Sequence, residues 1–137
     1  MVANNYLKYF ITNKSLMYVS SIAIAEYERK GTVEEVLAPY SYIPLDFTAR
    51  DAIICAEFAN ISEAKDRSAQ RDAVKDDVKQ PAQACHHDIN FVITDDKSSF
   101  AKYCISLRDL GKLETRVITL DYYDESYFRG GQRTLPI

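Results

Sequence analysis

Two patterns of apolar and polar positions alternate along the chain, and they predict helices and short strands in turn. Apolar side chains recur at helical spacing in some segments, whereas others are short apolar runs bounded by polar residues. The first pattern predicts helices over residues 3–13, 21–30, 32–39, 48–61, 76–85 and 98–110. The second predicts strands over residues 17–19, 42–45, 91–94 and 116–120. This order indicates one α/β domain over residues 1–137 around a mostly parallel sheet, with an aromatic C-terminal tail over 122–137.

Polar residues at the predicted helix ends refine these boundaries. Ser20 and Ser21 are suitable caps for the second helix, and Thr48 and Asp51 have the spacing of a capping box. Pro81 fits only the first turn or so of a helix, which places the Asp76–Asp77 pair near the start of the fifth helix. The dipole at a helix N-terminus favours such carboxylates.

The composition narrows the classes of function. The chain has 137 residues, of which 47% are apolar, and its 17 basic and 20 acidic side chains give a net charge of −3. This balance excludes a polybasic nucleic-acid binder but leaves a local basic patch open. No apolar run approaches the roughly 20 residues of a membrane span, and the first residues lack the pattern of a signal peptide. The chain has three cysteines that are far apart in the sequence, and such an odd, scattered set fits reduced thiols better than disulfides. We therefore expect a cytoplasmic protein. From the lack of a membrane span we expect no membrane partner.

Carboxylates lie at or beside the predicted strand-to-helix transitions, where parallel α/β domains place their sites. Asp95 and Asp96 directly follow the third predicted strand, Glu26 lies on the helix after the first, and Asp76 and Asp77 precede the third. Oxygen ligands of this kind suit Mg²⁺ or Mn²⁺, which polarise phosphates and activate water. Phosphodiester hydrolysis is the natural reaction class, although the same acids also fit helix caps on a solvated surface.

The two histidines of the chain, His86 and His87, are adjacent at the end of the fifth predicted helix. Neighbouring residues point in different directions from a helix, and no HExxH-type spacing accompanies this pair. We therefore interpret the histidines as a helix-end cap that interacts favourably with the helix dipole, rather than as a metal site.

Three segments resemble the motif blocks of the PIN-domain family. They are YVSSIAIAEYERKG at 18–31, VKDDVKQPAQA at 74–84 and FVITDDKSSF at 91–100, and the resemblance covers roughly residues 17–121. PIN domains are Mg²⁺- or Mn²⁺-dependent ribonucleases, and many are toxins of toxin–antitoxin pairs. The resemblance implies a three-layer α/β/α sandwich around a mostly parallel central sheet.

The residues that match the family's motifs are acids. Glu26, Asp77 and Asp96 match its catalytic and metal-binding positions, and Asp95 is implied as a further metal ligand beside them. The resemblance thus implies that these residues hold Mg²⁺ or Mn²⁺ and cleave an RNA substrate. It also implies an antitoxin protein as partner and a homodimer or other homo-oligomer.

One element of the family pattern is missing. A PIN domain opens with a strand that ends in a metal-binding Asp, and nothing before Tyr18 supplies it. We therefore expect an N-terminally incomplete domain, which a start codon placed too late, an inactive relative, or a strand from another segment or subunit would each explain. A catalytically inactive PIN-like binding module is the alternative function. An unrelated α/β domain whose acids are only helix caps is a third interpretation.

Overall fold

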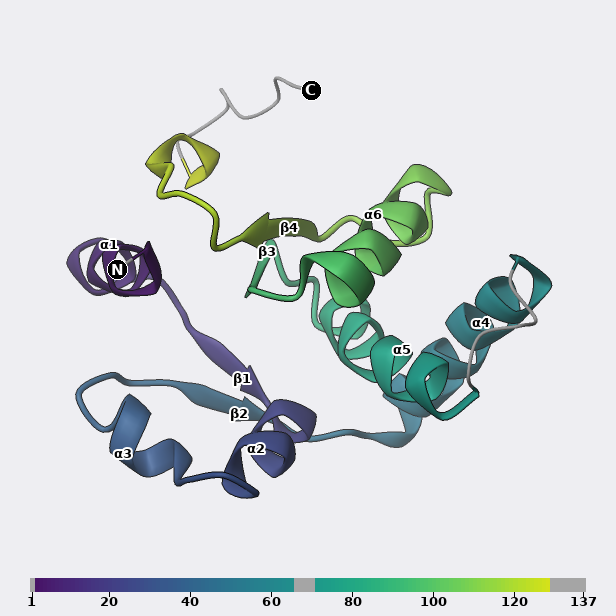
Figure 1. Ribbon diagram of the computed structural model, residues 1–137, viewed down its shortest axis with the longest axis horizontal. Coiled ribbons are helices and arrows are strands. Elements are labelled where there is room, and N and C mark those ends of the chain that lie inside the picture. Colours follow the sequence, from purple (N-terminus) through teal and green to yellow (C-terminus); the bar gives the residue numbers. More distant parts are fainter. Residues whose placement is uncertain (1, 66–70, 129–137) are drawn as a thin grey trace.

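The computed structural model consists of helices and short parallel strands (Figure 1). It describes residues 2–65 and 71–128, and it describes side chains over 2–61 and 78–128. The helices are α1 Val2–Thr12, α2 Ser21–Glu28, α3 Val33–Leu37, α4 Ala49–Lys65, α5 Arg71–His86 and α6 Lys102–Asp109. The strands are β1 Tyr18–Ser20, β2 Ile43–Leu45, β3 Phe91–Thr94 and β4 Arg116–Thr119. A π-helical turn, η1 Lys97–Ala101, precedes α6, and a 3₁₀ turn, η2 Glu125–Phe128, follows β4.

The strands form two parallel pairs. β1 pairs with β2, with Ser20 opposite Leu45, and β3 pairs with β4, with Thr94 opposite Thr119. Helices connect the strands within each pair, as parallel pairing requires. The predicted α/β class with parallel strands is therefore confirmed. Within the described residues the two pairs are separate sheets, so the single central sheet and the three-layer sandwich remain predictions.

Side-chain caps mark the starts of helices α2 and α4, as predicted, and Thr32 caps α3 in the same way. At the start of α2, Ser20 accepts a hydrogen bond from the backbone N–H of Ile22, as predicted. At the start of α4, the Thr48 hydroxyl accepts from the N–H of Asp51 at 3.3 Å, and the Asp51 carboxylate accepts from the N–H of Thr48 at 2.7 Å. This reciprocal pair is the predicted capping box, and it satisfies two backbone donors that the helix leaves without a partner.

Helix α5 differs from the prediction. It begins at Arg71, so Asp76 and Asp77 lie in its interior, and their expected place at a helix N-terminus is wrong. Pro81 is fully buried inside the helix, where it removes the backbone hydrogen bond to the carbonyl of Asp77 at a cost of roughly 3 kcal/mol. The helix continues through the proline because Val78 and Ala82, on either side of it, are completely buried in the core. Tertiary packing thus outweighs the local preference.

The main core lies between α4, α5 and α6 (Figure 1). Its buried side chains are Ile54, Phe58, Val78, Ala82, Phe100, Cys104, Leu107 and Leu113. Val92 of β3 and Val117 of β4 pack against this cluster, and the Tyr103 hydroxyl donates a hydrogen bond across it to the Phe58 carbonyl at 2.8 Å. The core therefore holds β3 and β4 of the second sheet in place against helices α4, α5 and α6.

The described part of the aromatic tail packs against α1. The ring of Phe128 lies 5.0 Å from that of Tyr9 and 4.9 Å from that of Phe91 in β3, measured between ring centroids. Tyr6 of α1 is 1% exposed, and its ring lies 4.9 Å from that of Tyr123. These contacts hold α1 next to the second sheet. Residues 129–137 of the predicted tail lie outside the described residues.

Candidate functional site

Each of the two strands of the second sheet ends at a threonine, and an aspartate follows two positions later. Thr94 and Thr119 lie opposite each other in the β3–β4 register, and Asp96 and Asp121 follow them by two positions. The strand ends read Val-Ile-Thr-Asp-Asp after β3 and Val-Ile-Thr-Leu-Asp after β4. Two carboxylates thus lie beyond the carboxyl ends of neighbouring parallel strands, where α/β proteins place their sites.

Asp96 is fixed by the turn that it caps. Its Oδ1 accepts the backbone N–H of Ser99 at 3.0 Å, and its Oδ2 accepts the Ser99 hydroxyl at 2.6 Å. The Ser99 hydroxyl first, and then the Ser99 N–H, lower the pKa of Asp96 below its usual value. The carboxylate is therefore held in its ionised form. The Phe100 N–H and, at 3.5 Å, the Ser98 hydroxyl also donate to this carboxylate, so a bound ion would have to take the place of one of these donors.

Asp121 is a residue of this strand end that the sequence reasoning did not identify. Lys97 forms an ion pair with it, and the Thr119 hydroxyl donates to it at 2.7 Å. Lys97 first, and then Thr119, lower the pKa of Asp121. The repeated Val-Ile-Thr-x-Asp pattern at the ends of the two predicted strands is the signal that could have found it.

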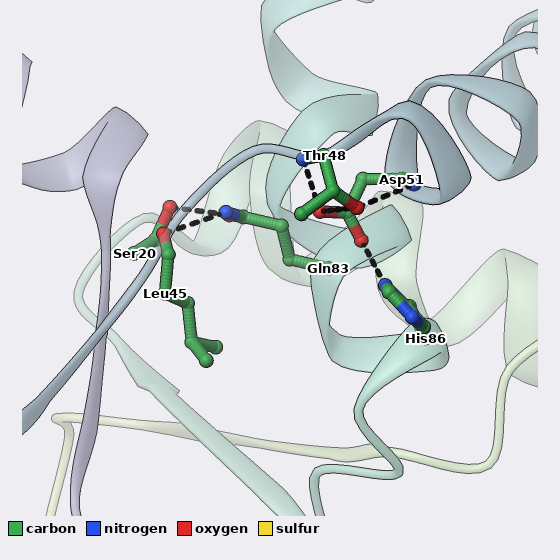
Figure 2. Close-up of polar contacts among 6 residues, drawn as sticks. All are labelled: Ser20, Leu45, Thr48, Asp51, Gln83 and His86. Carbon is green, nitrogen blue, oxygen red and sulfur yellow. Dashed lines mark hydrogen bonds and ion pairs between the residues drawn. The ribbon is translucent and has the colours of Figure 1, made fainter.

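A buried glutamine organises the carboxyl end of the first sheet (Figure 2). Gln83 in the last turn of α5 is 1% exposed. Its Oε1 accepts the Ser20 hydroxyl at 2.5 Å, and its Nε2 donates to the Leu45 carbonyl at 3.0 Å. Ser20 and Leu45 are the last residues of β1 and β2, so one side chain joins both strand ends to α5.

The acids predicted from the sequence do not form one group among the described side chains. Glu26 is exposed on α2, Asp95 is exposed directly after β3, and Asp96 is half-buried. None of these three belongs to a set of three described carboxylate, imidazole or thiol ligands that lie within 4.8 Å of one another. The side chain of Asp77 lies outside the described residues. The roles of these four acids therefore remain predictions.

A different group of described side chains has the geometry to hold a metal ion. Ligand atoms of Asp51, His86 and His87 all lie within 4.8 Å of one another. The two imidazole rings lie 4.3 Å apart between centroids, so the two side chains converge, although adjacent residues of a helix were expected to point in different directions. Helix α5 ends at His86, and His87 lies in the following turn with its backbone N–H still donating to the Gln83 carbonyl at 3.0 Å.

Comparison with protein-family models, with curated proteins and with solved structures finds no match to this chain. Among the residues that the structure describes, no helix is both long enough and apolar enough to cross a membrane.

Proposed function

We propose that this chain is a PIN-like, metal-dependent ribonuclease. The observation that carries the proposal is the position of Asp96 two residues beyond the end of β3, with Asp121 at the equivalent position after the parallel strand β4. Carboxylate ligands of this kind suit Mg²⁺ or Mn²⁺. When bound, such an ion supplies Lewis acidity for the attack of water on an RNA phosphodiester.

The carboxylate oxygens of the predicted acids are suitable ligands for these ions. Among the described side chains, however, these acids do not lie together as one group of ligands. In the proposal, Glu26, Asp77 and Asp96 hold the ion, with Asp95 beside them. Helix α2, which carries Glu26, contacts α5, which carries Asp77, and this contact supports their approach. The exposure of Glu26 and Asp95 supports a site that a large substrate can reach.

The proposal also includes an overall arrangement of the two pairs of strands. In it, both pairs belong to one central sheet of a three-layer α/β/α sandwich. The parallel direction within each pair and the helical connections between the strands support this arrangement. The proposal also assigns an antitoxin protein as the partner that covers the acids, a homo-oligomeric state and a cytoplasmic location.

Incubation of the purified chain with RNA in Mg²⁺, in Mn²⁺ and in a chelator tests this function. We expect RNA to be cut in the presence of either ion and to stay intact in the chelator. RNA that stays intact under all three conditions, with the chain shown to be folded by circular dichroism, contradicts the proposal.

The second candidate function is a non-catalytic PIN-like binding module. It is favoured by the separation of the predicted acids and by the open edges of the two sheets within the described residues. An unpaired strand edge is a surface to which a strand of another chain can add. A stable complex with a protein partner, without any metal-dependent cleavage of RNA, would distinguish this function from the first.

A further inference from the structure

Asp51 and His86 join the start of α4 to the end of α5 (Figure 2). Oδ1 of Asp51 lies 2.7 Å from Nδ1 of His86, whose side chain is 30% exposed, whereas that of Asp51 is 0% exposed. His87 is exposed beside them, with its ring tilted by 37° against that of His86. The group therefore extends from a buried carboxylate to the surface, which leaves an approach from solvent on the histidine side.

The carboxylate of Asp51 is fully buried, and each of its two oxygens has a polar partner. Thr48 occupies Oδ2 through its N–H at 2.7 Å and its hydroxyl at 3.0 Å. Oδ1 is the oxygen that faces the histidines. A buried carboxylate oxygen thus lies next to two imidazoles at the carbonyl end of a helix, where the helix dipole favours positive charge.

We propose that Asp51, His86 and His87 bind a divalent transition-metal ion, for which Zn²⁺ is the best chemical fit. Two imidazoles and one carboxylate, with water in the fourth position, form a tetrahedral zinc site. Imidazole nitrogens are poor ligands for Mg²⁺, so this site differs in kind from one made of acids alone. It shares no residue with the proposed ribonuclease site, and neither proposal depends on the other.

The geometry requires only small side-chain movements. Ligand atoms of a tetrahedral zinc site lie roughly 3.3 Å apart, given bonds of about 2.0–2.1 Å. The three ligand atoms already lie within 4.8 Å of one another. Binding of the ion through Nδ1 of His86 requires the neutral tautomer that carries its proton on Nε2, which cannot donate a hydrogen bond from Nδ1 to Asp51. The ion replaces that hydrogen bond, and the 2.7 Å separation of the two atoms widens.

A bound ion would link the start of α4 to the end of α5, two helices that contribute side chains to the main core. Asp51 lies in the first turn of α4, and His86 is the last residue of α5. Further along the same two helices, Ile54 and Phe58 of α4 and Ala82 of α5 belong to the main core. The expected consequence is a stabilised α4–α5 hairpin, since an ion that binds only the folded state shifts the equilibrium toward it.

The experiment uses the full chain, freed of metal by a chelator and then titrated with Zn²⁺ in a calorimeter, with Co²⁺ as a spectroscopic probe. We expect one ion per chain and a melting temperature that rises with Zn²⁺ and not with Mg²⁺. We also expect visible Co²⁺ bands typical of tetrahedral nitrogen and oxygen ligands. Strong thiolate charge-transfer bands would instead assign the ion to cysteine and overturn the proposal.

The decisive variant is His87→Ala. The described hydrogen bonds of Asp51 run to Thr48 and His86, so removal of the exposed His87 ring should leave the melting temperature of the metal-free chain unchanged. We expect its Zn²⁺ affinity to fall at least about tenfold. The exposed Asp109→Asn serves as a matched surface control and should keep the wild-type affinity. Equal Zn²⁺ affinity in the wild type, His87→Ala and His87→Gln, or no binding to the wild type, overturns the proposal.

Discussion

Thr94 and Thr119 lie opposite each other in the β3–β4 register, and each is followed two positions later by an aspartate. The two aspartates have different partners, since Ser99 holds Asp96 through neutral donors, whereas Lys97 pairs with Asp121 as a cation. Asp96 therefore keeps its negative charge without an ion pair to Lys97. This difference is consistent with the metal-ligand role that the family resemblance implies for Asp96, since the carboxylate of Asp121 already has a cationic partner.

Ser99→Ala should raise the pKa of Asp96 toward its usual value, because the Ser99 hydroxyl contributes most to the lowered pKa. A carboxyl group whose pKa is lower in the folded state than in the unfolded state stabilises the folded state. This contribution is fully present at pH values above the pKa of the unfolded state. That contribution is lost as the pH falls through the lowered folded value. Carboxyl chemical shifts followed by NMR across acidic pH measure the change, with Asp121 as an internal reference. A pKa of Asp96 that does not move in Ser99→Ala contradicts the hydrogen-bond geometry.

Asp51→Ala should lower the free energy of unfolding by about 3 kcal/mol, because it removes a helix cap and leaves hydrogen-bond donors of Thr48 and His86 without their acceptor. Urea denaturation in the presence of a chelator measures this loss without any contribution from metal. Asp109→Asn, on the exposed end of α6, should change the same quantity by less than about 0.5 kcal/mol. Equal stabilities of the two variants would show that the buried network contributes nothing.

Gln83→Leu should loosen the first sheet selectively. Leucine fills a similar volume but leaves the Ser20 hydroxyl and the Leu45 carbonyl without their partner, at a cost of about 1–3 kcal/mol. Hydrogen exchange read by mass spectrometry should show faster exchange at β1 and β2, with β3 and β4 unchanged. Uniform acceleration in all four strands would mean that Gln83 supports the whole fold and not the end of one sheet.

Local signals in the sequence predicted most of the elements, because those elements depend on neighbouring residues. The Thr48–Asp51 capping box and the Ser20 cap form as predicted, and the run at 91–94 is the strand β3. The start of α5 could not be predicted in this way. The unfavourable Pro81 suggested a later beginning, whereas burial of Val78 and Ala82 lets the helix pass through the proline.

Contacts between distant segments account for what the sequence did not predict at the candidate sites. Gln83 joins Ser20 and Leu45, which are far from it in the sequence, and its flanking alanines gave no sign of this role. The approach of His86 to Asp51 likewise depends on the packing of α5 against α4. Asp95 and Asp96 were placed correctly after the end of a strand from their local pattern, and their roles as metal ligands remain predictions.

The rate of RNA cleavage in Mn²⁺ by the wild type, Asp96→Asn and Asp109→Asn tests the central claim most directly. An amide is a poorer ligand for this ion than a carboxylate, so we predict that Asp96→Asn lowers the rate at least about tenfold. Asp109→Asn should cleave at the wild-type rate, with both variants folded as judged by circular dichroism. Equal rates for the wild type and Asp96→Asn, or no cleavage by the wild type, would contradict a metal-dependent ribonuclease built on Asp96.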